Sequence, residues 1–187
     1  MPRPKTQSDQ EVLKSAHTLM HARGPEALTF ATLAAACGLS GATLVQRFKT
    51  KEKLIQATLL YAWDRLDERT AALSAKAPKT PAGAIRLLAK LSGSYGGIEA
   101  YASGLLVLRE DVRDPVLRAR GTAWKAALSQ ALEACFAGTP HKPRDIGLLM
   151  ATHWQGSLLW WSFDPNQNVA AYVEANLKRF IAATVRH

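Results

Sequence analysis

The 187-residue sequence is poor in cysteine and has no long apolar run free of polar residues. Its two cysteines, Cys37 and Cys135, lie far apart, and nothing in their pattern calls for a disulfide framework. The first ten residues contain basic side chains but no apolar stretch, so we expect no signal peptide. Ile146–Phe163 lacks Asp, Glu, Lys and Arg, but His153 and Gln155 interrupt it, which favours a buried helix over a membrane span. We therefore expect a cytoplasmic protein without a membrane segment.

The sequence motifs of common catalytic and cofactor sites are absent. We find no phosphate-binding loop, no G-x-G-x-x-G, no G-x-S-x-G and no C-x-x-C. His17 and His21 are four residues apart and can face one metal ion, but no third ligand is evident, so a surface pair near DNA is the favoured interpretation. We predict that the chain is not an enzyme and has no cofactor and no metal site.

Acidic residues are fewer than basic ones, 15 against 24, which gives a formal net charge of +9. This excess favours an anionic partner. Residues 1–53 carry eight Lys and Arg against four acids, so about half of the excess lies in the rest of the chain. Because a basic surface often only keeps a protein soluble, charge alone does not decide the function.

No segment has a convincing strand alternation, so we predict an all-α fold. The long fourth helix, at 1.5 Å per residue, spans roughly 37 Å, which is enough to join two domains. We predict a helix-turn-helix DNA-binding domain over residues 1–53 and a ligand-binding and dimerisation domain over 54–187. The predicted helices cover 8–23, 29–37, 41–48, 51–75, 81–95, 98–109, 114–137, 144–163 and 167–184.

The stretch 28–54 has the order of residues expected of a helix-turn-helix. Thr29 is a candidate N-cap, Gly38 can end that helix in a left-handed conformation, and Ser40 can cap the next helix. Leu44 stands one turn from Phe48 on one face of the second helix. Two short helices joined by a tight Gly-containing turn make this motif, whose second helix enters the DNA major groove.

The predicted recognition helix has small or polar residues on its outer side, which let the backbone approach base edges. Gln46 can bond an adenine edge, whereas Thr43 and Lys51 can hold phosphates. Taken singly, these residues are as readily explained by helix capping and solvation; the whole ordered string favours DNA binding. The predicted DNA-binding residues are Thr29, Ser40, Gly41, Ala42, Thr43, Gln46, Arg47 and Lys51.

This string resembles the TetR family of bacterial transcriptional repressors, whose pattern runs roughly T-x-x-x-I-A-x-x-A-G-V-S-x-G-T-L-Y-x-H-F-x-S-K-E-x-L. Val45 and Arg47 stand where the family usually has Tyr and His, which commonly touch the DNA backbone. Ala42 replaces the second Gly, and Cys37 replaces an Ala. The residues in register are Thr29, Ala34, Gly38, Ser40, Thr43, Leu44, Phe48, Lys51, Glu52 and Leu54.

The resemblance implies a ligand-responsive repressor that acts as a homodimer and leaves its operator when a small molecule binds. Each of the last two predicted helices carries a continuous stripe of candidate interface residues along one face. Two such helices from each chain can form a four-helix bundle with twofold symmetry. That symmetry predicts a palindromic double-stranded operator. The predicted dimer-interface residues are Leu149, Gly156, Trp160, Val173, Leu177 and Phe180.

Aromatic residues are frequent in the second predicted domain. By base rate they are core residues, yet a tryptophan-rich helical body also suits an apolar pocket. Such a pocket would take a small hydrophobic or aromatic effector. The predicted pocket residues are Trp63, Tyr95, Tyr101, Leu105, Trp124, His153 and Trp154.

Two other interpretations stay open at this stage. One is a constitutive DNA-binding protein without an effector, which a solid body core would favour. The other is an enzyme or carrier whose N-terminal helices are only structural, which would need convergent titratable groups in the body, and the sequence suggests none.

Overall fold

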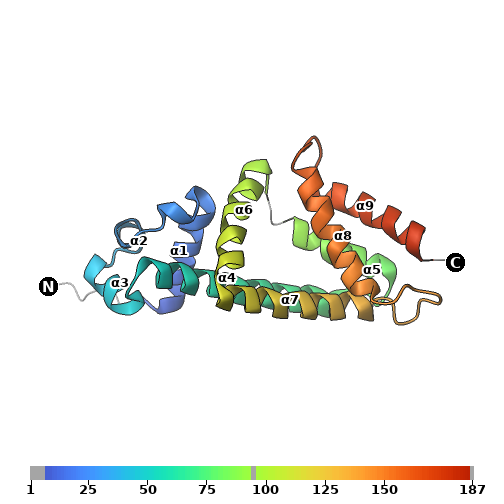
Figure 1. Cartoon of the computed structure of the whole chain (residues 1–187), viewed down its shortest axis with the longest axis horizontal. Coiled ribbons are helices and arrows are strands. Elements are labelled where there is room, and N and C mark those ends of the chain that lie inside the picture. Colours follow the sequence, from blue (N-terminus) through green and yellow to red (C-terminus); the bar gives the residue numbers. More distant parts are fainter. Residues whose placement is uncertain (1–6, 94–95, 186–187) are drawn as a thin grey trace. The chain divides into compact units, whose positions relative to one another are not determined.

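A computed structural model describes residues 7–93 and 96–185 (Figure 1). This part of the chain contains helices and no strands, which confirms the all-α prediction. None of its helices is both long and apolar enough to cross a membrane. The helices are α1 (Asp9–Arg23), the short 3-10 helix η1 (Pro25–Ala27), α2 (Phe30–Cys37), α3 (Gly41–Phe48), α4 (Lys51–Lys76), α5 (Pro81–Ser92), α6 (Ile98–Arg113), α7 (Pro115–Ala134), α8 (Ile146–Trp161) and α9 (Val169–Thr184).

Side-chain caps fix the starts of most helices near the predicted residues. Ser8 and Glu11 form a capping box at α1, and the Thr50 hydroxyl accepts a hydrogen bond from the Lys53 amide at the start of α4. The last two helices start two residues later than predicted. Asp145 has a positive φ of 56°, so α8 cannot begin before it, and Asn168 caps α9 through two backbone amides.

Other helix ends also differ from the prediction. Helix α6 continues to Arg113, four residues further than expected, and α7 ends at Ala134 instead of residue 137. The short η1 is not predicted by the sequence, because glycine and proline at positions 24 and 25 indicate the end of a helix and not a further helical turn.

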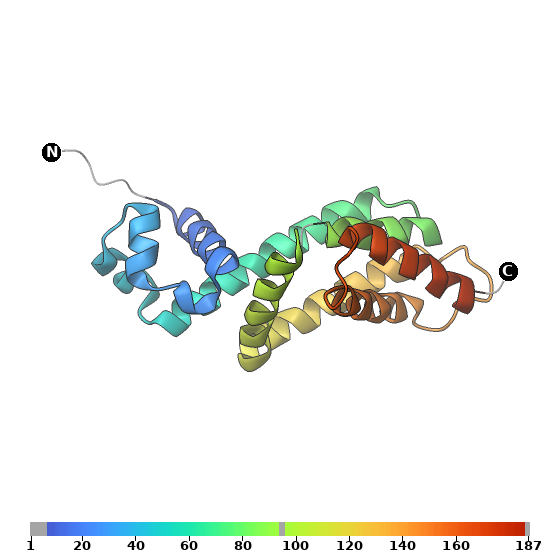
Figure 2. The ribbon, with the colours of Figure 1, turned by 90° about the horizontal axis from the view of Figure 1, so that it is seen from above.

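The chain forms two compact units, which we call the first and second unit. The first contains the described residues up to Arg65 together with Ala102–Gly121, and the second contains Leu66–Tyr101 with Thr122 onward. In the first unit, α1, η1, α2 and α3 lie around the start of α4 (Figure 2). Their shared core is Val12, Ala16, Met20, Leu28, Leu33, Cys37, Leu44, Phe48, Leu54, Leu59 and Leu117.

Leu117 shows that this core is not made of the N-terminal helices alone. It is almost fully buried in the same cluster, although it comes from the start of α7. The predicted 1–53 domain therefore lies inside a larger unit, which also takes in all of α6 after its first turn and the first turns of α7.

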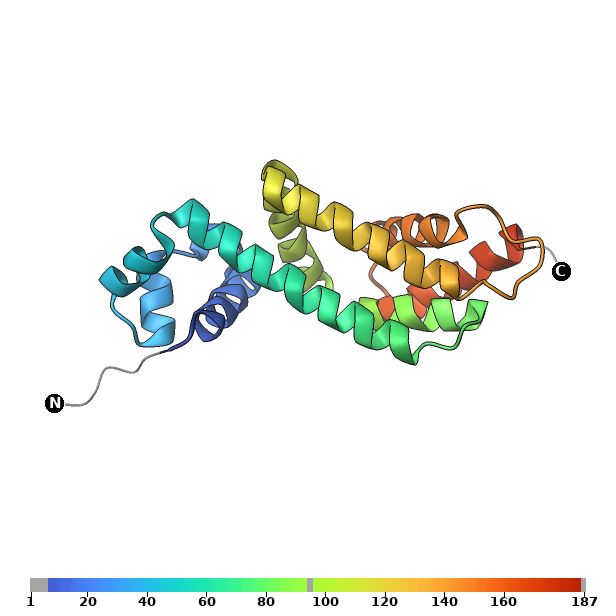
Figure 3. The same cartoon turned by 90° about the horizontal axis from the view of Figure 1, so that it is seen from below.

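The second unit is built from the end of α4, α5, most of α7, and α8 and α9. Helix α9 packs against both α5 and α8. Gly147 allows α8 to approach α7 closely, because a Cβ there would lie 2.1 Å from the carbonyl oxygen of Ser129 on α7. The Glu133 carboxylate of α7 also accepts a hydrogen bond from the Gly147 amide and so caps the start of α8. Figure 3 shows α7, α8 and α9 in this unit, and α4 as one unbroken helix.

Candidate nucleic-acid interface

The turn between α2 and α3 is set by one glycine and one serine. Gly38 adopts φ 67°, a left-handed conformation, and its amide donates to the carbonyl of Ala34 to close α2. Two residues later the Ser40 hydroxyl accepts a hydrogen bond from the Thr43 amide at 3.1 Å. Leu39 packs against the core between them. The structure therefore builds the turn in the way the sequence predicts.

Helix α3 has one buried face and one exposed face. Leu44 and Phe48 enter the core, whereas Ala42 and Gln46 are exposed. Val45 is also 44% exposed, which is high for an apolar side chain. The outer surface is thus a low ridge of a methyl, an isopropyl and an amide group, a shape that can enter a major groove. An isopropyl group suits contact with a thymine methyl, so Val45 joins the candidate base-reading residues.

Val45 was missed as a base contact because its position was judged only by the tyrosine hydroxyl that it lacks. Its exposure could have been inferred from the helical period, since it follows the buried Leu44 directly. Gly41 and Thr43 are partly buried, and the Thr43 hydroxyl lies 2.8 Å from that of Ser40. In the free chain, these two residues mainly shape the start of α3.

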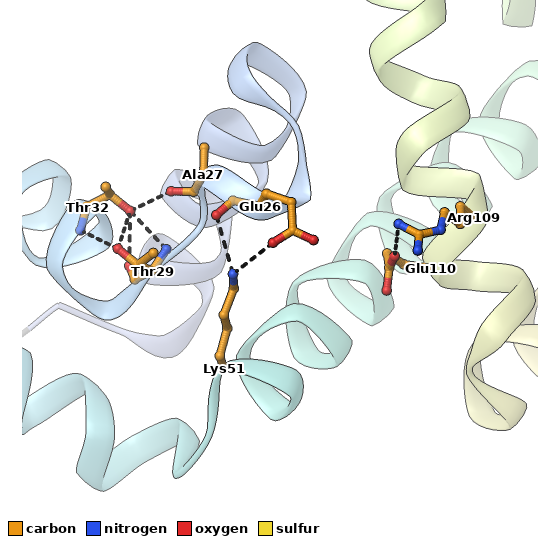
Figure 4. Close-up of polar contacts among 7 residues, drawn as sticks. All are labelled: Glu26, Ala27, Thr29, Thr32, Lys51, Arg109 and Glu110. Carbon is orange, nitrogen blue, oxygen red and sulfur yellow. Dashed lines mark hydrogen bonds and ion pairs between the residues drawn. The ribbon is translucent and has the colours of Figure 1, made fainter.

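Thr29 lies in a closed hydrogen-bond network at the start of α2. Its hydroxyl accepts from the Thr32 amide at 3.1 Å, and the Thr32 hydroxyl donates to the carbonyl of Ala27 at 2.8 Å (Figure 4). The Thr29 amide in turn donates to the Thr32 hydroxyl. This capping box fixes the angle between η1 and α2.

Arg47 makes a different contact from the phosphate or base contact that we predicted. Its guanidinium donates to the carbonyl oxygen of Gln7 at 2.9 Å and pairs with the Asp9 carboxylate at 3.1 Å. The side chain is only 24% exposed. In the free chain, Arg47 therefore holds the entry to α1 against α3, and a DNA contact would require it to leave these partners.

Lys51 also has partners inside the chain. Its ammonium nitrogen lies 3.3 Å from the Glu26 carboxylate and 3.3 Å from the Glu26 carbonyl oxygen (Figure 4). The neighbouring Lys49 and Lys53 are exposed. Both have no acidic partner within residues 7–93 and 96–185. Three lysines thus surround the end of α3 and the start of α4, and one of them is paired.

Polar contacts join the first half of α4 to the α6–α7 corner within the first unit. The Gln56 amide donates to Asp114 at 2.7 Å, and the Trp63 indole N–H donates to Asp111 at 2.9 Å. Burial raises the pKa of Asp111 to about 6, and the nearby charge of Asp114 adds to the rise, although the bond from Trp63 opposes it. A hollow of about 520 Å³ lies beside these contacts, lined by Pro25, Glu26, Lys51, Glu52, Ile55, Gln56, Glu110, Arg113, Asp114, Pro115 and Leu117.

The residues predicted to line an effector pocket fall in both units. Trp63 and Leu105 belong to the first unit, Tyr101, Trp124, His153 and Trp154 belong to the second, and Tyr95 lies outside the described residues. Neither the hollow just described nor a second one of about 500 Å³ near Glu133 and Lys142 is lined by any of them.

The two buried tryptophans of this set are satisfied inside the second unit. The Trp124 indole N–H donates to Thr70 at 3.0 Å, and that of Trp154 donates to Ser92 at 2.8 Å. Their ring centres lie 6.3 Å apart. These tryptophans are core residues in the structure, and their N–H groups already have protein partners.

Among the members of the set that the structure describes, His153 has a buried atom without a hydrogen-bond partner. Its imidazole stacks on Phe180 of α9 with ring centres 4.7 Å apart, and its Nε2 is buried without a hydrogen-bond partner in the part of the chain described. His153 therefore lies between α8 and α9, next to the predicted dimer face.

The predicted dimer face is exposed on α8 and largely buried on α9. Leu149 is 42% exposed and Trp160 is 68% exposed, and Gly156 has open space in front of its Cα. In contrast, Val173 and Leu177 have no exposed surface in the single chain. They pack inside the second unit, so their side chains have no surface left for a partner, and they are removed from the candidate interface. Phe180, stacked on His153, is partly exposed.

Residues 12–58, from α1 into α4, match the profile of the bacterial regulatory proteins of the tetR family. The likeness to this family is therefore carried by the N-terminal segment, residues 12–58. The match contains the capped turn and all of α3, which are the parts that form the exposed ridge. The matching profile describes bacterial regulatory proteins and not enzymes.

Solved structures extend this likeness over the whole chain at the level of fold. A transcriptional regulator from Rhodococcus sp. Rha1 is 17% identical with a TM-score of 0.70, covering 96% of this chain and 100% of its own. The ketosteroid transcriptional regulator KstR2 of Mycobacterium tuberculosis is 16% identical with a TM-score of 0.62, covering 100% of both chains. AibR, solved with isovaleryl coenzyme A and operator DNA, is 21% identical with a TM-score of 0.61, covering 94% of this chain and 97% of its own. No curated protein sequence matches the chain.

Proposed function

We propose that this chain is a TetR-family regulator that binds double-stranded operator DNA as a homodimer, with α3 in the major groove, and represses transcription until a small hydrophobic effector releases it. The exposed ridge of Ala42, Val45 and Gln46 carries the DNA-binding part of this proposal. The ridge lies on a helix that is rigidly capped at Ser40 and anchored by Leu44 and Phe48, within the segment that matches the family profile. AibR, a structural relative, was solved with operator DNA.

Selection of binding sequences from random duplex DNA by the full chain tests this function. We expect a palindromic sequence to be enriched, with half-sites about one helical turn apart, because a twofold dimer presents two copies of α3. A variant with Gln46→Ala and Val45→Ala together should select a different or less defined sequence. The selection should give no enriched sequence if α3 does not read DNA.

A homodimer accounts for the exposed apolar surface of α8. Leu149, Leu159 and Trp160 on α8, and Phe163 just after it, are each more than 40% exposed, and exposed large apolar side chains gathered on one element commonly mark an interaction site. Because a C2 interface uses the same patch on both chains, this surface and Gly156 can face their own copies. The α9 contribution comes from Phe180 and its exposed neighbours, and not from Val173 or Leu177.

Release by an effector is the least constrained part of the proposal. It is supported by the apolar, aromatic character of the second unit and by the bound acyl coenzyme A of AibR. A constitutive DNA-binding protein is the second candidate. The paired indole N–H groups of Trp124 and Trp154 favour it, because they place those two side chains in a closed core. Operator release by a panel of apolar compounds distinguishes the two candidates.

A further inference from the structure

Four cations lie around the proposed DNA-binding face, and they fall into two classes. Arg47 and Lys51 are each ion-paired with an acid of the first unit, Asp9 and Glu26. Lys49 and Lys53 are exposed and have no acidic partner in the described ranges. Two of these four positive charges are therefore already ion-paired within the chain before it binds DNA.

The two ion pairs differ in how firmly they are held. The Arg47 guanidinium is 24% exposed and also bonds the Gln7 carbonyl, so losing Asp9 would still leave it anchored. Lys51 also donates to the Glu26 carbonyl oxygen at 3.3 Å, but this pair is on the surface, since the Glu26 side chain is 89% exposed and that of Lys51 is 36% exposed. Lys51 can leave Glu26 without breaking the core.

The Glu26 side chain contributes little to the stability of the turn in which it lies. The turn in which it lies is held by the Thr29–Thr32 box and the bond from Thr32 to the Ala27 carbonyl, as Figure 4 shows. The buried Leu28 anchors the same turn in the core. In the described part of the chain, the Glu26 carboxylate makes its one ion pair with Lys51. Its effect is therefore expected on Lys51 and not on folding.

We propose that Glu26 competes with DNA phosphate for the ammonium group of Lys51 and so lowers the affinity of the chain for all DNA. This inference rests on the proposed DNA-binding function. Each time Lys51 binds a phosphate, it must first leave the Glu26 carboxylate, and the energy of that pair is subtracted from binding. Phosphate contacts carry no base information, so the competition changes affinity and leaves sequence preference unchanged.

The expected size of the effect follows from the exposure of the pair. Exposed ion pairs change an equilibrium constant by roughly 1.4- to 5-fold. A phosphate can therefore displace Glu26, and yet the difference is measurable. The effect should fall as salt rises, because screening weakens exposed charge pairs.

The test compares Glu26→Gln with the wild-type full chain on two probes, a 30-base-pair duplex of mixed sequence and the duplex obtained by selection. In low salt, we expect Glu26→Gln to bind both probes about 1.4- to 5-fold more tightly for each half-site that the dimer contacts, with the ratio between the probes unchanged. Its thermal unfolding should stay at the wild-type temperature. Glu110→Gln is the matched control, because Glu110 lies in the same unit but pairs with Arg109.

A double-mutant cycle with Lys51→Met separates direct competition for the Lys51 ammonium group from the general electrostatic effect of the Glu26 charge on DNA binding. Glu26→Gln should give no gain in the Lys51→Met background and should keep its gain in the Lys53→Met background. A gain that persists without Lys51, or no gain in the wild-type background, overturns the inference. A wild-type chain that binds neither probe removes the proposed function and the inference with it, whereas binding that Glu26→Gln leaves unchanged removes only the inference.

Discussion

At the scale of single residues, two partly buried groups of the first unit respond to pH in opposite ways. His17 packs against His21 and Tyr61, with ring centres 4.4 and 6.3 Å away. Burial lowers the pKa of His17 to about 4, and the charge of His21 adds to the fall. Asp111, bonded to Trp63, has its pKa raised to about 6, mainly by burial.

The two shifts predict opposite slopes of stability in the same pH window. The unfolded chain binds a proton at His17 below about pH 6.5 and the folded chain only near pH 4, so this residue makes the fold less stable as pH falls from 6.5 to 4. Asp111 binds its proton more tightly when folded, so its contribution is lost as pH rises from 3.8 to 6. Each shift is worth at most about 3 kcal/mol, and partial solvent access lowers that figure.

Urea unfolding at pH 7.5, 5.5 and 4 measures both effects. The free energy of unfolding of His17→Leu should fall less than that of the wild type between pH 7.5 and pH 4. Asp111→Asn, which keeps an acceptor for Trp63, should equal or exceed the wild type at pH 7.5 and lose that advantage by pH 4. Two variants that follow the wild-type pH curve in parallel would show that neither group is perturbed.

Gln46 is the residue for which base reading is predicted most specifically. It is exposed on α3, and its amide can make two hydrogen bonds to an adenine. Gln46→Ala should cost roughly 1–3 kcal/mol at one base pair of each half-site and remove the preference there. Lys53→Ala is the comparison, because loss of a phosphate contact should weaken all sequences alike and flatten the salt dependence by about one unit of slope. Equal losses on all sequences for both variants would contradict the role of Gln46.

At the scale of elements, Gly38 and Gly41 give a matched pair. A Cβ at either position meets nothing within 4 Å, but Gly38 has a φ of 67° and Gly41 opens α3 without a positive φ. Gly38→Ala should destabilise the fold by about 1 kcal/mol or more through backbone strain alone. Gly41→Ala should keep or raise stability, because alanine favours the helix.

Thermal unfolding and DNA titration together separate the two roles of these glycines. Gly41→Ala should weaken DNA binding despite an unchanged melting temperature, since its methyl group stands on the proposed DNA face. Gly38→Ala should lower the melting temperature first. Equal melting temperatures for the two variants would contradict the backbone strain expected for alanine at position 38.

At this scale, the sequence predicted contacts between residues close together in the chain and missed contacts between distant ones. Caps such as Thr29 with Thr32 and Ser40 with Thr43 act over three residues, so the sequence predicted Thr29 and Ser40 as capping residues. Gln56 and Asp114 meet although 58 residues separate them, and nothing in helical periodicity indicates such a partner. For the same reason, α9 could not be divided by sequence into a face for the core and a face for a partner, and Val173 and Leu177 were assigned wrongly.

At the scale of the whole molecule, the exposed apolar face of α8 predicts self-association. Gly156→Arg should place a long charged side chain in the centre of that face and produce monomers in sedimentation velocity at micromolar concentration. Ala126→Arg is the control, because it places the same charged side chain at an exposed position on another helix, α7. A wild-type chain that sediments as a monomer would contradict the dimer.

Effector binding predicts a coupled change in tryptophan emission and DNA affinity. Trp124 and Trp154 lie close together in the core of the second unit, so a compound that enters there should alter their fluorescence. Such compounds should also release the selected duplex, because a ligand shifts DNA binding only by preferring the arrangement that cannot bind. Trp124→Phe should reduce the fluorescence change. Quenching without any change in DNA affinity would favour the constitutive regulator.

The burial of Leu117 among the N-terminal helices has a consequence for synthesis on the ribosome. Helices α1–α3 emerge early, but their core stays incomplete until residues 102–121 have been translated. At roughly 5–20 residues per second, several seconds pass between the exit of Arg65 and the arrival of that segment. During this interval the core beneath the nascent recognition helix is incomplete, so the chain acquires its proposed DNA-binding surface only after residues 66–101 of the second unit have also been made.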